Sequence, residues 1–331
     1  MLIALRKRPT AKNFFILACV AILFVFAATK IYNYYEHDIC ISLYTYVSGI
    51  VVCGPPDIIS KADYEGLRLS ISSYITSQEA SGSVKDVAVY FRDLVHGPTF
   101  GINALENYAP ASLLKLPLAL AYLNVVDTYP GLLEKKIGYT GTTTSPLEQT
   151  FPPAVSIESG HFYSIREMIF NMLVYSDNKS YTVLGNYFEN DIPNGNQLLY
   201  QAYQDLGILA PQETLDQNIS VHSYASLFRS LYNASYLDPK PSEEILSWLT
   251  QSTFKLGLVA GVPQSIKVAH KFGEFTFPDN SHQLHDCGII YYPGNPYLLC
   301  IMTKGTDWTA LEKTIQTISA MTYKEVDSRK L

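Results

Sequence analysis

A serine followed three residues later by a lysine brings a nucleophile and a base close to one another. Ser112-Leu-Leu-Lys115 has this spacing, and on a helix the amine would lie one turn from the hydroxyl, on the same face. A hydroxyl needs such a proton acceptor within hydrogen-bond reach before it can attack an electrophilic carbon. The pair therefore predicts nucleophilic catalysis through Ser112, with Lys115 as the base.

The surroundings favour this pair over two others with the same spacing, Ser176 with Lys179 and Ser252 with Lys255. Lys115 stands among leucines in a segment that should be buried, and desolvation would lower the pKa of its ammonium group toward that of a usable base. The preceding Tyr108-Ala-Pro-Ala111 predicts a helix start, where the helix dipole favours negative charge on Ser112.

Two further motifs follow along the chain. Ser176-Asp177-Asn178 ends an apolar helix that opens with the capping box Ser164-Ile-Arg-Glu167. His270-Lys271-Phe272-Gly273 lies on an expected strand. With these three motifs in this order, the sequence from about Ser60 to the C-terminus resembles the penicillin-recognising serine hydrolases, and most closely the class A β-lactamase-like group.

The resemblance implies a catalytic role for three residues. Ser112 would attack a carbonyl and form an acyl-enzyme, and Lys115 would accept its proton. Ser176 would relay a proton to the leaving nitrogen, with help from Lys271. No metal and no other cofactor is expected to take part.

The resemblance also implies a set of substrate-binding residues: Asn178, Lys271, Gly273 and Glu274. Asn178 would bind the amide of the substrate's acyl side chain. The backbone N–H groups of Ser112 and Glu274 would form the oxyanion hole, in which each donor is usually worth about 3 to 4 kcal/mol.

Two departures from the family pattern affect substrate binding and turnover. Phe272 stands where the family carries Thr or Ser, so the hydroxyl that helps to hold the substrate carboxylate is missing. The loop from Leu209 to Ser220 contains a single glutamate, Glu213, and Leu215 and Asp216 come one position early for the family's deacylation motif. Glu213 is a candidate deacylation base, and a surface carboxylate is the alternative. Without a base, the acyl-enzyme should persist.

Local patterns predict the elements that position these motifs. The expected order is a helix, two strands, a helical block, three strands and a final helix. Their expected ranges are Asp57–Gln78, Asp86–Leu94, Thr99–Asn103, Ser112 to about Leu256, Ile266–Phe277, Asp286–Tyr292, Tyr297–Thr303 and a helix from Asp307. The chain is therefore expected to be α/β, with the three-layer β-lactamase-like fold. Its antiparallel five-stranded sheet would be built from both chain ends, with an inserted all-helical subdomain.

Composition is consistent with a folded domain. Of the 331 residues, 47% are hydrophobic and only 16% charged, which excludes a disordered chain. The net charge is −6, although residues 1–30 carry five cations and no acid, so the remainder is strongly acidic and nucleic acid is not expected as a partner.

The first thirty residues resemble a membrane-targeting segment. Sixteen uncharged residues, Phe14 to Thr29, follow four cations, which places the N-terminus in the cytoplasm and the remainder outside. The segment would serve as an anchor or, if Val25-Phe26-Ala27 is cleaved, as a signal peptide of a secreted protein. The expected organisation is a tail and anchor (1–30), a juxtamembrane segment (31–56) and the hydrolase domain (57–331). Within the domain, 57–105 and 265–331 form the α/β part and 106–264 the helical part.

The cysteines and histidines leave alternatives open. Outside the cytoplasm, Cys40 with Cys53 and Cys287 with Cys300 can form disulfides, or the second pair can be two buried thiols on neighbouring strands. His282, His285 and Cys287, with Asp286 and His270 nearby, could bind zinc, but their spacing fits no common zinc module.

The sequence therefore predicts a membrane-anchored, extracytoplasmic serine hydrolase. Its expected substrates are β-lactams or the D-alanyl stem peptides of peptidoglycan, with slow deacylation. The alternative is a non-catalytic module on the same fold that senses β-lactams or peptidoglycan. Phe272 and the short loop favour that alternative, whereas Ser112 and Lys115 favour the enzyme.

Overall fold

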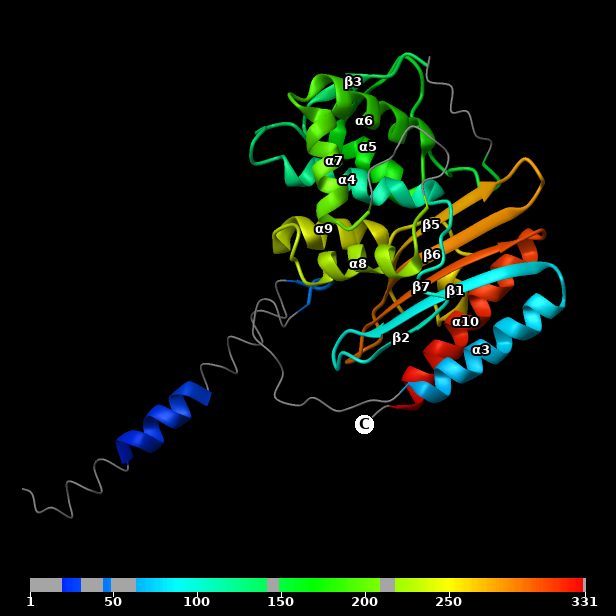
Figure 1. Cartoon of the computed structure of the whole chain (residues 1–331). Helices are drawn as coiled ribbons and strands as arrows, with labels where there is room; N and C mark the ends of the chain where they lie inside the picture. The colour runs from blue at the N-terminus through cyan, green and yellow to red at the C-terminus, as the bar shows by residue number, and fades with distance from the viewer. Residues whose placement is uncertain (1–19, 31–43, 49–63, 142–148, 209–217, 330–331) are drawn as a thin grey trace, which may run out of the picture.

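The structure is a computed structural model that describes residues 20–30, 44–48, 64–141, 149–208 and 218–329. Its centre is an antiparallel sheet in the order β2-β1-β7-β6-β5 (Figure 1). The strands are β1 (Val84–Asp93), β2 (Thr99–Ile102), β5 (Val268–Thr276), β6 (His282–Ile290) and β7 (Tyr297–Gly305). The expected five-stranded sheet assembled from both ends of the chain is confirmed.

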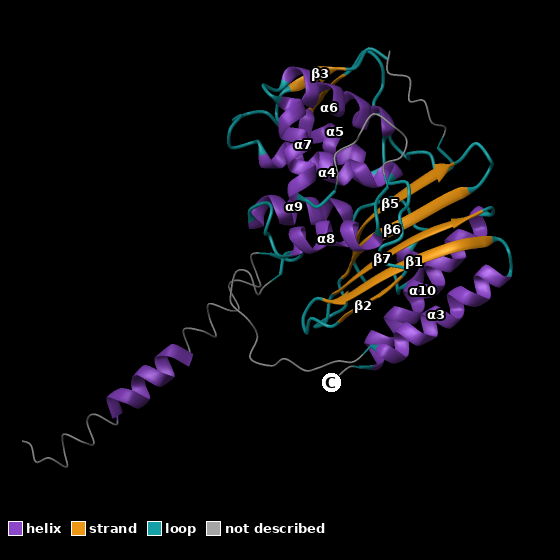
Figure 2. Cartoon of the chain, in the orientation of Figure 1, coloured by secondary structure: helices purple, strands orange, loops and turns teal. Residues whose placement is uncertain are grey.

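Helices cover both faces of this sheet. Helices α3 (Glu65–Ala80) and α10 (Trp308–Ser328) lie on one face, where the short helix η2 (Leu258–Gly261) packs on α10, and the α-helices between β2 and β5 lie on the other (Figure 2). Side chains of β1 alternate between the two resulting cores: Val87 and Val89 pack with the α3 and α10 side, and Ala88 and Tyr90 with the other. The three-layer α/β fold is confirmed.

The segment between β2 and β5 is mainly helical, as expected. Its helices are η1 (Ala111–Leu114), α4 (Lys115–Asn124), α5 (Ile165–Val174), α6 (Asn178–Asp191), α7 (Gly195–Asp205), α8 (Val221–Tyr232), α9 (Pro239–Leu249) and η2 (Leu258–Gly261). The expected capping box of α5 is present, formed by Ser164 and Glu167, and Ser220 caps α8. The segment also contains a small two-stranded sheet of β3 (Lys136–Gly138) and β4 (Phe162–Ser164), which the sequence pattern does not predict.

Most expected strand boundaries agree with the structure within two residues, and two boundaries differ by more. The first helix begins at Glu65 within the described part of the chain, while residues 57–63 lie outside it. Strand β6 begins at His282, four residues before the expected start at Asp286. Polar residues obscure this start, because Gln283 and His285 are buried in the sheet, where each forms a hydrogen bond with the backbone of Ala109.

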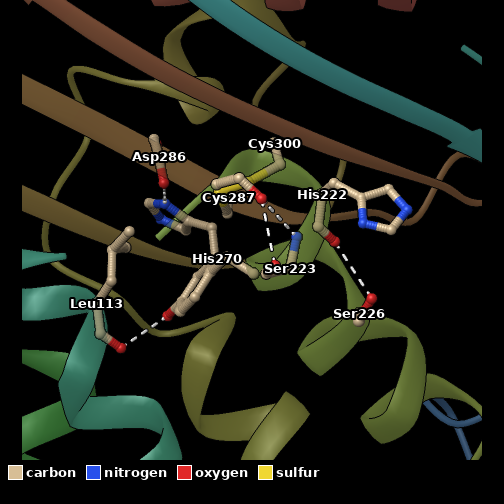
Figure 3. Close-up of a disulfide and its surroundings, with 10 residues drawn as sticks. Leu113, His222, Ser223, Ser226, His270, Asp286, Cys287 and Cys300 are labelled. Atoms are coloured by element: carbon tan, nitrogen blue, oxygen red, sulfur yellow. Dashed lines mark hydrogen bonds and ion pairs between the residues drawn. A yellow bond between two sulfur atoms is a disulfide. The ribbon is translucent and has the colours of Figure 1, made fainter. Parts of the chain in front are cut away.

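A disulfide joins Cys287 of β6 to Cys300 of β7, two residues that lie directly opposite one another (Figure 3). Of the two alternatives for this pair, the structure therefore shows the disulfide and not two free thiols. Cys40 and Cys53 lie outside the described residues.

Parts of the segment that precedes the domain are also described. Residues 20–30 are helical, and their apolar side chains are exposed. Within the described ranges, no helix is both long enough and apolar enough to cross a membrane. Further along, the backbone N–H groups of Thr45, Tyr46 and Val47 donate to the Glu243 carboxylate on α9. This short piece of the expected juxtamembrane segment is thereby tied to the helical layer.

Candidate active site

Ser112 lies on η1, a turn of 3-10 helix that leads directly into α4, so the expected helix start is a tighter turn. Ala111 adopts a positive φ of 47°, a left-handed conformation that costs energy for a residue with a side chain. The hydroxyl of Tyr224, a residue of α8, donates to the Leu113 carbonyl over 3.0 Å and so supports the turn. The Ser112 hydroxyl therefore sits on a strained but well-supported backbone.

Lys115, the first residue of α4, is 1% exposed and lies among four oxygen atoms. Its Nζ is 3.0 Å from Ser112 Oγ and 3.0 Å from Ser176 Oγ. The same amine is 2.5 Å from the Ser176 carbonyl oxygen and 2.6 Å from Asn178 Oδ1. The Ser176 carbonyl oxygen and Asn178 Oδ1 can only accept hydrogen bonds. A neutral Lys115 amine therefore donates its two N–H groups to them, and its lone pair remains available for a hydroxyl proton.

Burial lowers the pKa of the Lys115 ammonium group from 10.5 to about 7, because water no longer solvates the charged form. The carboxylates of Asp177 and Glu274 favour the charged form and oppose only part of this shift. A large share of the amine is therefore neutral at physiological pH, as general-base chemistry requires.

The Ser176-Asp177-Asn178 motif forms the turn between α5 and α6. Ser176 is buried and has a φ of 58°, and its hydroxyl oxygen accepts from both Lys115 and Lys271. Asp177 fixes this turn, because its carboxylate caps α6 through the backbone N–H groups of Lys179 and Ser180. Asn178 Oδ1 accepts from Lys115, and this contact leaves the Nδ2 group as a candidate donor to a substrate carbonyl.

Strand β5 is the edge strand of the sheet and lies beside η1. Lys271 is 1% exposed, and its Nζ donates to Ser176 Oγ over 3.0 Å and to the Phe272 carbonyl over 2.9 Å. Its burial, together with the charge of Lys115, holds the pKa of Lys271 well below its usual value. Gly273 lies so close to η1 that a Cβ there would stand 3.0 Å from Leu113 Cγ and 3.2 Å from the Pro110 carbonyl oxygen, so a larger residue would push the turn that carries Ser112.

The structure thus brings Ser112, Lys115, Ser176, Asn178 and Lys271 into one chain of contacts, although the last lies on a strand 95 residues beyond Ser176. Gly273 lies against the same turn. Their chemical roles stay predictions.

Glu274 shows a feature that the sequence does not reveal. Its carboxylate accepts from the backbone N–H of Thr150 over 2.9 Å and from that of Phe151 over 3.0 Å. The neighbouring Gln149 donates from Nε2 to the Ser176 carbonyl over 3.4 Å. The segment 149–151 therefore borders the site, yet it carries no motif and lies 124 residues from Glu274, so no spacing signals it.

The candidate deacylation base and the candidate zinc ligands are not part of this chain of contacts in the described residues. Glu213 lies outside the described residues. Cys287 is bonded to Cys300, His270 pairs with the buried Asp286 at 2.8 Å (Figure 3), and His282 stacks on Trp308. The described ranges hold no cluster of three or more His, Cys, Asp or Glu residues suited to a metal ion.

These features define a serine hydrolase fold of the β-lactamase type. The model of the β-lactamase enzyme family matches residues 70–326, and the chain belongs to this family. No curated protein matches the sequence.

Solved structures similar to this chain share its fold at low sequence identity. One is the penicillin G acyl-enzyme complex of the L158E mutant of PBP-A. It is 19% identical, covers 82% of this chain and all of its own, and has a TM-score of 0.66. A class A β-lactamase from Mycobacterium abscessus and a β-lactamase from Chitinophaga pinensis are each 21% identical. Each alignment covers 78% of this chain and 99% of the other, with a TM-score of 0.65.

Proposed function

We propose that the protein is a serine acyl-transfer hydrolase that forms an acyl-enzyme on Ser112. The observation that carries this proposal is the position of the Lys115 amine. It is almost completely buried, its pKa is lowered to about 7, and it lies 3.0 Å from both the Ser112 and Ser176 hydroxyl oxygens. A buried amine between two hydroxyl groups is suited to take a proton from one and pass it to the other.

The steps follow from these contacts. Neutral Lys115 removes the proton of Ser112, whose Oγ forms a bond with the substrate carbonyl carbon. The Lys115 ammonium returns a proton through Ser176 to the leaving nitrogen as the carbon–nitrogen bond breaks. Lys271, a further donor to Ser176 Oγ, orients that hydroxyl. The backbone N–H groups of Ser112 and Glu274 are the proposed oxyanion donors.

The proposed substrates are β-lactams or D-alanyl peptides of peptidoglycan. A strained cyclic amide and a peptide bond offer the same carbonyl carbon and nitrogen leaving group to this arrangement. Support for β-lactams comes from the family and from the PBP-A mutant, whose complex with penicillin G is an acyl-enzyme. Slow release of the acyl group belongs to the proposal, with Glu213 as the candidate base for water.

The proposed location is the extracytoplasmic side of a membrane, with residues 14–29 as the anchor or a cleaved signal. Exposed apolar side chains along residues 20–30 and the cations that precede them support this part.

Intact mass spectrometry after exposure to penicillin G tests the enzymatic proposal. Ring opening releases no fragment, so wild-type protein should gain the whole mass of penicillin G, and peptide mapping should place it on Ser112. The adduct should persist for minutes or longer if deacylation is slow. Ser252→Ala is the matched control, because it removes another Ser-x-x-Lys serine and should leave labelling unchanged. An equal adduct on Ser112→Ala, or none on the wild type with either penicillin G or its methyl ester, would refute the assignment.

A further inference from the structure

An aromatic cluster occupies the β5 side of the site. The rings of Phe272 and Phe254 stack with their centroids 4.0 Å apart, and Phe151 meets them edge-on at 6.2 and 5.3 Å. Trp308 packs on Phe151 at 5.6 Å. The Phe272 ring is also 4.4 Å from Lys271 Nζ, so the cluster directly adjoins the polar site.

The position of Phe151 depends on Glu274. Both carboxylate oxygens of Glu274 accept backbone N–H groups of the segment 150–151, which fixes Phe151 against the other rings. Phe272 is only 4% exposed and packs in the core on the α10 side of the sheet, whereas Phe151 is partly exposed. A substrate with its carbonyl at Ser112 would therefore meet Phe151 on its β5 side, with Phe272 directly behind that ring. That wall offers ring carbons and no hydroxyl.

The charges around the site do not attract an anion. The carboxylates that act on Lys115 are Asp177 and Glu274, and those that act on Lys271 are Asp286 and Glu274. Both amines are themselves buried, where the charged form is disfavoured. The further cation Lys255 interacts with Asp286 and directs its amine to the Ser252 carbonyl. A substrate carboxylate would therefore lose water beside aromatic rings and a fixed carboxylate.

We propose, on the basis of the proposed acyl transfer, that this site selects substrates with an uncharged, apolar group on the β5 side of the scissile bond over those with a free carboxylate. Phe272 and Phe151 are the specificity-determining residues, and Glu274 is the positioning residue that holds Phe151. An ester or amide at this place buries apolar surface against the rings and brings no charge.

Penicillin G and its methyl ester provide the test, because they differ only at this carboxylate. Acylation of Ser112 is followed by time-resolved intact mass at equal concentrations of each compound. Wild-type protein should acylate at least tenfold faster with the ester than with the acid. A rate with the acid equal to or above that with the ester would overturn the selectivity while leaving acyl transfer intact. Absence of an adduct with both compounds would instead overturn the proposed function, and the selectivity with it.

Variants locate the selectivity. Phe272→Thr should lower the ester-to-acid ratio at least tenfold, because a hydroxyl replaces a ring at the wall. Phe275→Thr makes the same change three residues further along β5, where the ring packs on Phe277, and it should leave the ratio unchanged. Phe151→Ala changes a partly exposed ring at the edge of the core and should lower the ratio at least fivefold, so it decides the question if Phe272→Thr fails to fold. Unchanged ratios in folded Phe272→Thr or in Phe151→Ala would contradict the assignment of these residues.

Discussion

Replacing Lys115 with methionine is expected to slow acylation of Ser112 about 10³-fold, the middle of the range for loss of a general base. Methionine keeps the length and apolar contacts of the lysine stem but has no lone pair that can take the Ser112 proton. The nucleophile remains in place in this variant, so the loss reports the base alone. Time-resolved intact mass with penicillin G measures the rate.

Two controls accompany this variant. Lys255→Met removes the lysine of another Ser-x-x-Lys pair, which donates to a backbone carbonyl and is outside the proposed machinery, so its acylation rate should match the wild type. Lys115→Met also leaves Asn178 Oδ1 and the Ser176 carbonyl without their donor, at a cost of about 1 to 3 kcal/mol each. Circular dichroism must therefore show that the variant is folded. A folded variant with a loss below tenfold would show that another group takes the proton.

The local structure of each motif can be predicted from the sequence, because it depends on residues close together along the chain. Ser112 and Lys115 are three residues apart, so any helical turn brings them together. Asp177 caps the helix that follows it, and Ser164 with Glu167 caps an earlier one. The apolar neighbours of Lys271 predict a strand. Local rules do not predict that these distant segments meet in one site. That expectation comes from the resemblance to a known family.

Other parts of the site depend on contacts between distant segments, and no local pattern encodes them. Glu274 binds the backbone of Thr150, 124 residues away, through N–H groups that every residue type except proline carries. The aromatic cluster is a similar case, because a sequence with 15 phenylalanines gives no reason to pair Phe272 with Phe254 or Phe151. The start of β6 cannot be predicted for a related reason: a histidine in a polar stretch gives no sign of burial, whereas in the fold His285 is buried and hydrogen-bonded to the Ala109 carbonyl.

The acylation rate of the wild-type protein is expected to rise about tenfold for each pH unit below 7 and to level off above about pH 7, a change of about 100-fold between pH 5 and pH 8. Only the neutral amine of Lys115 can accept the Ser112 proton. Burial lowers the pKa of this group to about 7, so protonation removes the base as the pH falls through that value. An exposed lysine would instead give a rate that still rises beyond pH 9.

Time-resolved intact mass measurements with penicillin G from pH 5 to pH 9 provide the pH profile of the acylation rate. The carboxylate of the substrate stays ionised throughout this range, so its own titration does not contribute. Lys115 and Lys271 influence each other, so the observed midpoint belongs to the pair. Lys255→Met, which leaves both amines in place, should give the same midpoint. A rate that is flat across this range, or one that rises only above pH 9, would mean that the amine beside Ser112 is not the base, even if an acyl-enzyme forms.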